Sequence, residues 1–187
     1  MWRFANPVAI HWTDDLASLL PSLLPPGQGL LITYPQFAAA ARAGLLSGPL
    51  AGLPWFSGVE ANPTPDQVQQ AIDFARPLAP RWILAVGGGS VLDTAKIVRL
   101  ALARDCPSVR ELLLAIPPEA GAERPLLIAA PSTHGTGAEL TQWAALWDME
   151  SNRKWLKSLS EEIGSTDAIL TEMKIATLRK VKGITVD

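Results

Sequence analysis

A glycine triplet placed between an apolar run and a helix-forming stretch is the feature that most constrains this fold. Residues 82–86 (WILAV) have the composition of a buried strand, Gly87, Gly88 and Gly89 follow at once, and a helix is expected to begin near Ser90. Glycine lets the backbone turn tightly and approach a ligand closely. The amino-terminal end of the helix would present free N–H groups to an anion. The stretch predicts an anion-binding loop or, as the alternative, a strand–helix turn that binds nothing.

A second loop of small polar residues, 131–141, follows another apolar run at 126–130. The hydroxyl groups of Ser132, Thr133 and Thr136 can donate to phosphate or ribose oxygens. Ligands of open α/β sheets bind at the carboxyl ends of the strands, where these two loops would meet. The pair therefore favours a dinucleotide site more than either loop does, although a hydroxyl-rich turn remains the alternative here.

The rest of the chain alternates helix-forming and strand-forming segments. Thr64, Pro65 and Gln67 give the clearest helix start, with a cap, a proline at the first helical position and a capping-box glutamine. Ser108 and Glu111 form a second capping box. Asp93 is expected in the first turn of its helix, to stabilise the dipole or to order the glycine loop. We also expect helices at residues 16–24 and from Pro35 to near Gly48, and strands at 29–33 and 53–56. This alternation predicts an α/β fold, with a mostly parallel sheet covered by helices on both faces.

Composition narrows the classes of function. Of 187 residues, 48% are hydrophobic and 18% charged, which suits a buried core rather than a disordered chain. The net charge of −2 comes with no basic block, so nucleic acid is not an expected partner. No apolar run is long enough for a membrane span and no signal peptide is recognisable, which predicts a cytoplasmic protein. Cys106 is the one cysteine, so the chain can form neither an internal disulfide nor a cysteine metal site.

Taken together, the two loops resemble the iron-containing (group III) alcohol dehydrogenase family. The family carries a GGGSxxDxAK stretch followed, at about this separation, by a PTTxGTGSE-V-T stretch. Residues 87–96 (GGGSVLDTAK) and 131–141 (PSTHGTGAELT) correspond to them, and Asn62-Pro63-Thr64 and Asn6-Pro7-Val8 are further matches. The resemblance covers roughly residues 6–170. The pairing of Trp147-Asp148 with a later lysine-rich stretch is similar to the phosphonoacetaldehyde reductase branch.

The resemblance implies a Rossmann-like domain that binds NAD or NADP and, in the full-length family, a small alcohol or aldehyde substrate. Gly87, Gly88, Gly89, Ser90 and Asp93 would surround the pyrophosphate. Ser132, Thr133 and Thr136 would lie along the phosphates and the nicotinamide ribose, and Lys154 looks like the family lysine that reaches that ribose. Tyr34 stands where the family often has an aspartate that selects NAD, so this position leaves the choice between NAD and NADP open.

The resemblance also implies a metal centre that this chain is not expected to hold. Family members bind Fe²⁺ with one aspartate and three histidines in a helical second domain. The chain has two histidines, His11 and His134, neither in such a context, so the metal ligands and the second domain are expected to be absent. We expect a nucleotide-binding domain over residues 1–170 and a tail over 171–187 that no longer follows the family. A truncated gene, a frameshift product and a chain cut at the domain boundary all fit this pattern.

Three functional hypotheses follow. The first is the cofactor-binding portion of an NAD(P)-dependent alcohol dehydrogenase or aldehyde reductase, which is not expected to turn over substrate alone. The second is a catalytically inactive fragment that binds nucleotide or a protein partner. Loss of the second domain would leave an apolar surface near residues 140–170, which is compatible with a homo-oligomer. The third, less favoured, is a lyase like dehydroquinate synthase, whose related domain also uses a glycine triplet with NAD.

Overall fold

The structure is a computed structural model that describes residues 8–13, 16–40, 52–114, 124–133, 135–149, 153–158 and 168–171. Six strands form one parallel sheet in the spatial order β1-β8-β5-β4-β2-β3. These strands are β1 (Ala9–Trp12), β2 (Gly29–Thr33), β3 (Trp55–Phe56), β4 (Trp82–Gly87), β5 (Leu126–Pro131) and β8 (Ala168–Thr171). The parallel sheet predicted from the sequence is confirmed.

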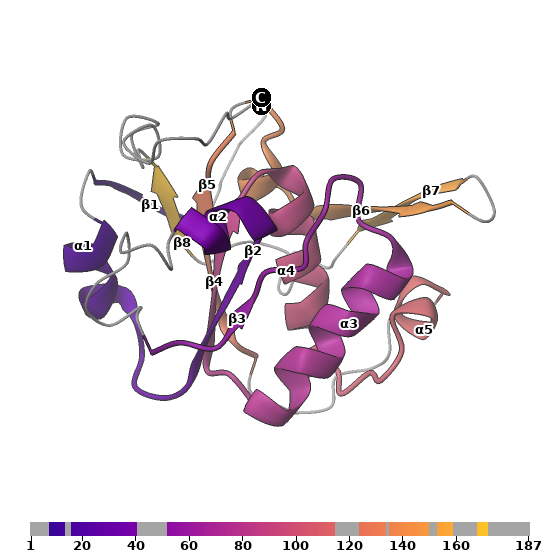
Figure 1. Cartoon of the computed structure of the whole chain (residues 1–187), viewed down its shortest axis with the longest axis horizontal. Helices are drawn as coiled ribbons and strands as arrows, with labels where there is room; N and C mark the ends of the chain where they lie inside the picture. Colours follow the sequence, from indigo (N-terminus) through magenta and orange to yellow (C-terminus); the bar gives the residue numbers. More distant parts are fainter. Residues whose placement is uncertain are drawn as a thin grey trace, which may run out of the picture.

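Helices cover both faces of the sheet, as the sequence predicts (Figure 1). On one face lie α3 (Pro65–Ala75), α4 (Gly89–Ala103) and α5 (Val109–Leu114), packed on alternate strand residues such as Ile83 and Ala85. On the other face α1 (Leu16–Leu23) and α2 (Pro35–Ala40) pack through Leu20 and Phe37 on Leu84 and Val86. Strands buried on both faces are uniformly apolar because neither face meets water.

The helix starts follow the capping signals in the sequence. At α3 the Thr64 side chain accepts from the Gln67 N–H at 3.3 Å, while the Gln67 side chain accepts from the Thr64 N–H at 3.1 Å. At α5 the Ser108 hydroxyl accepts from the Glu111 N–H at 3.4 Å. A short 3₁₀ helix, η3 (Arg76–Leu78), follows α3.

Some boundaries differ from those expected. The third strand has two residues, Trp55–Phe56, rather than the four expected, and α1 ends at Leu23, one residue early. The helix that begins at Pro35 is described as far as Ala40, and its expected end near Gly48 lies outside the described residues. Among the described residues, no helix has the length and apolar character needed to cross a bilayer.

A two-stranded antiparallel sheet stands beside the main one and was not anticipated from the sequence. It consists of β6 (Trp143–Asp148) and β7 (Arg153–Ser158), with Trp147 opposite Lys154. Its inner face packs through Ala144 and Leu146 on the α3–α4 side of the core. Trp155 is paired with Leu146 across this hairpin. The 3₁₀ helix η4 (Ala138–Leu140) links β5 to this hairpin.

The order of the strands locates the ligand-binding edge. After β2 the chain moves outward to β3, whereas after β4 it moves to β5 in the opposite direction. Open α/β sheets bind ligands at the carboxyl ends of the strands where the direction reverses. The reversal here falls between β2 and β4, whose carboxyl ends carry Tyr34 and the glycine triplet.

Candidate functional site

The two polar loops predicted from the sequence lie in contact with each other. β4 and β5 are neighbours, with Gly87 in register with Pro131. The Ser132 N–H donates to the Gly87 carbonyl at 2.9 Å, which continues the sheet pairing into the loops. Adjacent parallel strands therefore deliver both loops to one edge of the sheet.

The glycines are needed for this close approach. A Cβ on Gly88 would lie 3.0 Å from Thr133 Oγ1, and one on Gly89 would lie 3.2 Å from Thr136 Cγ2. Gly88 caps α4 with φ −81° and ψ −170°, a conformation open to any residue, so backbone freedom is not what selects glycine there. Lack of a side chain lets the second loop pack directly on the start of α4.

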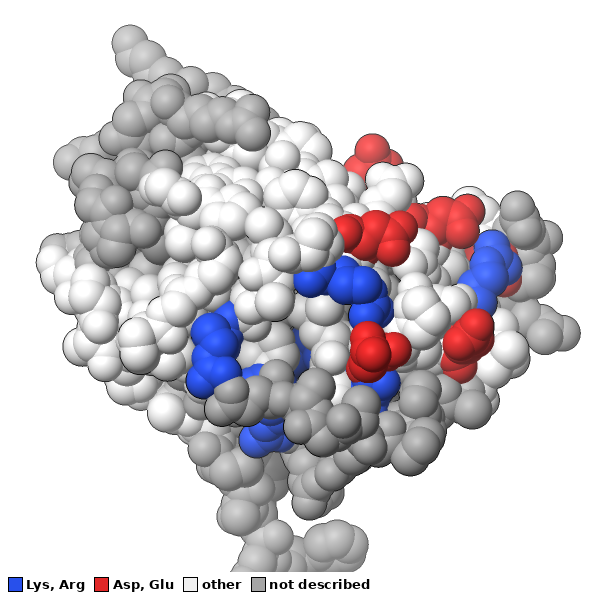
Figure 2. Space-filling model, turned by 90° about the horizontal axis from the view of Figure 1, so that it is seen from below, with Lys and Arg blue, Asp and Glu red and all other residues white. Residues whose placement is uncertain are grey.

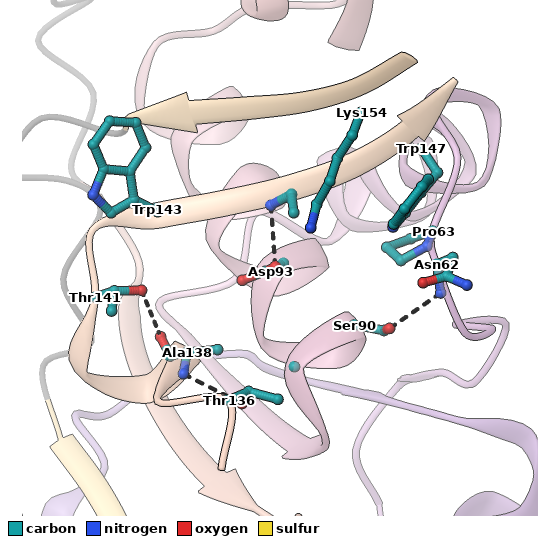
Figure 3. A pocket seen from close by; sticks show the side chains of 12 residues that line it. Asn62, Pro63, Ser90, Asp93, Thr136, Ala138, Thr141, Trp143, Trp147 and Lys154 are labelled. Atoms are coloured by element: carbon teal, nitrogen blue, oxygen red, sulfur yellow. Dashed lines mark hydrogen bonds between the residues drawn. The ribbon is translucent and has the colours of Figure 1, made fainter. Parts of the chain in front are cut away.

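A cleft of about 420 Å³ opens beside the amino-terminal end of α4. Figure 3 shows its lining, which comes from α4, the second loop, the hairpin and the turn before α3. The residues that line it are Asn62, Pro63, Gly89, Ser90, Asp93, Thr136, Ala138, Thr141, Trp143, Ala145, Trp147 and Lys154. The Ser90 hydroxyl accepts from the Asn62 N–H at 3.3 Å, which ties the helix start to that turn.

The structure divides the residues predicted for the cofactor into two groups. Those that line the cleft are Gly89, Ser90, Asp93, Thr136 and Lys154. Those that lie in the adjoining loop contact, outside the cleft lining, are Gly87, Gly88, Ser132 and Thr133. His134, a loop residue singled out in the sequence, lies outside the described residues.

Asp93 is placed differently from the expectation. It lies beyond the first turn of α4, which holds no acidic residue. Its Oδ2 accepts from the Ala145 N–H of β6 at 3.0 Å, so it fastens the hairpin rather than the glycine loop. Its Oδ1 is buried, has no hydrogen-bond partner among the described residues and lies 3.8 Å from Lys96 Nζ. Burial raises the pKa of Asp93, opposed first by the Ala145 hydrogen bond and then by the charges of Lys96 and Lys154.

Lys96 is a key residue of the site that the sequence reasoning did not single out. Its side chain is 0% exposed, and Nζ donates to the carbonyls of Ala138 at 2.5 Å, Thr141 at 2.7 Å and Trp143 at 2.9 Å. Burial lowers the pKa of Lys96 to about 8, while the nearby carboxylates of Asp93 and Glu139 act in the opposite direction. The sequence feature that could have identified Lys96 is its position as a single lysine in an otherwise apolar helical run, residues 95–98.

Lys154 stands at the rim of the cleft on β7. Its Nζ lies 5.1 Å from the centre of the Trp147 ring, a cation–π contact between cross-strand partners (Figure 3). The backbone N–H of Trp147 donates to the Pro63 carbonyl at 2.9 Å, which joins the hairpin to the turn before α3. The hairpin thus forms one wall of the cleft, which presents the Trp147 ring and the Lys154 ammonium group.

Tyr34 closes the edge of the site next to β2. Its ring is half-buried, with its centre 6.0 Å from that of Phe37, and would contact a Cβ placed on Gly87. Burial raises the pKa of the Tyr34 phenol, and a hydrogen bond with the Ser132 side chain lowers it in part. Tyr34 is therefore neutral at physiological pH and brings no carboxylate to this position.

The comparison with known families agrees with this geometry. The sequence model of the family described as iron-containing alcohol dehydrogenase matches residues 11–171, which include β1, both loops, the hairpin and β8. The chain belongs to this family. The resemblance inferred from the two loops is confirmed, and the match ends where β8 ends.

Curated relatives of this alcohol dehydrogenase family chain include reductases and dehydrogenases. Phosphonoacetaldehyde reductase of Streptomyces viridochromogenes is 35% identical over 154 residues, which cover 79% of this chain and 38% of the relative. Choline dehydrogenase of Bacillus subtilis is 35% identical over 150 residues, covering 78% of this chain and 36% of the relative. The chain therefore spans less than half the length of these relatives.

Solved structures share the fold of this family member. Sulfoacetaldehyde reductase from Bifidobacterium kashiwanohense, solved in complex with NAD⁺, superposes with a TM-score of 0.73 at 20% identity, covering 91% of this chain and 46% of that one. NADH-dependent butanol dehydrogenase A from Thermotoga maritima gives a TM-score of 0.69 at 20% identity, covering 91% and 44%. At such identities the likeness establishes the fold.

The family name implies iron, and the residues present do not fit an iron centre. Among the residues that the structure describes, no group of three or more His, Cys, Asp or Glu side chains is arranged to hold a metal ion. His11 lies on β1, on the far side of β8 from the loop that follows β5. No chemical step is therefore assigned to a metal on these residues.

Proposed function

We propose that this chain is the dinucleotide-binding portion of an NAD(P)-dependent alcohol or aldehyde oxidoreductase. The observation that supports it best is the cleft at the start of α4, flanked by the second polar loop at the switch point of a parallel sheet. The relatives named above carry out reductions or oxidations of this class by their names, and one structural neighbour was solved with NAD⁺.

Each part of the cleft has a role in this proposal. The first N–H groups of α4, at Gly89 and Ser90, have no acceptor within the helix and suit a pyrophosphate, with the helix dipole adding favourable charge. The Thr136 hydroxyl lies opposite them in the second loop. Gly88, Ser132 and Thr133 lie outside the cleft lining, and their role in the proposal is to hold the two loops together.

The hairpin would receive the reactive end of the cofactor. A bound nicotinamide supplies the hydride acceptor or donor for the alcohol–aldehyde interconversion. Lys154, Trp143 and Trp147 line this end of the cleft. In the proposal Lys154 would donate to ribose hydroxyls, and the two tryptophans would shield that end from water. The substrate pocket and any metal would come from outside the described residues.

Calorimetric titration with NADH and NADPH, with and without Fe²⁺ or Zn²⁺, tests the proposal. We expect saturable binding that does not require metal. Gly89→Val would push Thr136 away and weaken binding by at least ~10-fold, since a site displaced by about 1 Å loses that much or more. Gly52→Val is the control, because a Cβ there meets nothing within 4 Å. A folded chain that binds neither nucleotide at millimolar concentration would refute the proposal.

A second function, an inactive fragment that binds a partner or itself, draws support from a different observation. Four large apolar side chains near the hairpin are exposed: Leu140 (49%), Trp143 (44%), Trp147 (36%) and Met149 (74%). Sedimentation velocity over a range of concentrations distinguishes the two. A monodisperse monomer that binds NADH supports the first function, and self-association without nucleotide binding supports the second.

A further inference from the structure

The hairpin wall of the cleft is held by packing and side-chain contacts with the helices, because within the described residues it shares no strand pairing with the main sheet. β6 and β7 pair with each other and with no other strand among those described. An isolated two-stranded hairpin is marginally stable in water. Trp143, Ala145, Trp147 and Lys154 all line the cleft from this hairpin, so its position sets the shape of the proposed nucleotide site.

One buried side chain, that of Lys96, binds three backbone carbonyls at the start of this wall. The three carbonyls that Lys96 binds, those of Ala138, Thr141 and Trp143, span η4, the following turn and the first residue of β6. An ammonium group has three N–H donors, and here each meets a carbonyl. Lys96 is absent from the cleft lining and fully buried, so it acts from behind the wall.

Asp93 supports the same segment from the preceding turn of α4. Its carboxylate holds the Ala145 N–H at 3.0 Å and lies 3.8 Å from Lys96 Nζ (Figure 3 shows the Ala145 bond). Lys96 thus binds carbonyl groups, and Asp93 binds an N–H group, of the same stretch of backbone, residues 138–145. The two side chains are three residues apart on one helix. α4 carries Gly89 and Ser90 at its start, so one helix both presents the anion site and fixes the facing wall.

We propose that Lys96 is a positioning residue that latches the hairpin wall to α4 and thereby sets the nucleotide affinity of the cleft. This inference rests on the proposed nucleotide-binding function. It requires Lys96 to act on binding through the backbone of residues 138–143, without touching the nucleotide.

Lys96→Met tests the latch, because Met keeps the length of the buried chain and removes all three donors. The matched control is Arg99→Met, on the next turn of α4. Arg99 is also buried, at 1% exposure, and its Nε donates to the Pro125 carbonyl at 2.8 Å, at the opposite end of β5 from the cleft. Both variants lose a buried cation on one helix, but the Lys96 contacts named above are with the wall, whereas the Arg99–Pro125 contact lies at the other end of β5.

Two readouts separate the latch from a general loss of stability. Amide hydrogen exchange without nucleotide should become at least ~10-fold faster in β6 for Lys96→Met, while β4 and β5 change little, and Arg99→Met should leave β6 protected. The dissociation constant for NADH should rise at least ~10-fold in Lys96→Met and less than ~2-fold in Arg99→Met. Equal effects of the two variants, or an unchanged β6 in Lys96→Met, would overturn the inference.

The wild-type protein supplies a further test should Lys96→Met not fold. If the latch holds, the Ala145 amide should exchange as slowly as amides in the middle of α4, since the two open together. Exchange of β6 that is ~100-fold faster than that of α4 would show that the wall is not held. If the wild type binds no nucleotide, the proposed function fails, whereas the exchange comparison still decides whether the wall is held to α4, and the two variants decide whether Lys96 holds it.

Discussion

At the scale of single residues, Lys96 shows how a buried charge is tolerated when its donors are satisfied. Three carbonyls and the nearby carboxylates of Asp93 and Glu139 replace the water that an exposed ammonium would have. Burial outweighs these partners, since the pKa of Lys96 falls from 10.5 to about 8. The folded protein therefore binds this proton less tightly than the unfolded chain does.

This difference predicts a pH dependence of stability. Between about pH 8 and pH 10.5 the unfolded chain keeps the Lys96 proton that the folded chain has released, so raising the pH through this window stabilises the fold. The free energy of unfolding of the wild type, minus that of Lys96→Met, should rise by roughly 2 kcal/mol from pH 7 to pH 10. Urea unfolding of both proteins at each pH measures it. If the difference in free energy of unfolding does not change with pH, the pKa of Lys96 in the folded protein is that of an ordinary lysine.

Residue roles in the site could be predicted from the sequence only in part. The loop pattern placed Ser90 and Thr136 at the cleft, because each follows a strand end whose location the pattern predicts, whereas Lys154 was assigned by the family resemblance. The same reasoning misjudged Asp93, whose partner Ala145 lies 52 positions away on a strand that had not been recognised. Lys96 was missed for the same reason, since its acceptors are backbone carbonyls that no side-chain pattern reveals.

At the scale of elements, α3 offers a direct test of how local signals stabilise the fold. Thr64→Ala removes the side-chain acceptor of the capping box and should lower the free energy of unfolding by about 1 kcal/mol. Ser22→Ala is the control, because that exposed hydroxyl bonds only the Leu19 carbonyl within its own helix, and a change below about 0.5 kcal/mol is expected. Urea unfolding distinguishes the two, and equal losses would contradict the capping role.

The main sheet was predictable because its central strands are short apolar runs bounded by turn residues. Residues 29–33 match β2, and the apolar runs at 82–86 and 126–130 fall within β4 and β5. The hairpin was not predicted, although Ala144 and Leu146 alternate with more exposed residues along β6. Its signal is weak because β7 contains basic residues on both sides of Trp155, a pattern equally typical of a solvated loop.

At the scale of the whole molecule, the described residues form three layers around one sheet, with the hairpin to one side (Figure 1). On the face seen in Figure 2, basic and acidic side chains lie interspersed. The ion pairs among the described residues include Arg76–Asp105 at 2.7 Å and Arg110–Asp66 at 3.4 Å. Such exposed pairs contribute at most about 1 kcal/mol each. Stability therefore comes mainly from the two apolar layers.

The central claim is that the two loops and the hairpin wall bind one nicotinamide dinucleotide. The measurement that tests it most directly is a two-dimensional amide NMR titration of the wild-type chain with NADH. We predict saturable shifts concentrated at residues 88–90, at 133–137 and at the indole N–H groups of Trp143 and Trp147. A folded chain in which these signals stay fixed, or in which the shifts gather away from the cleft, would contradict the account.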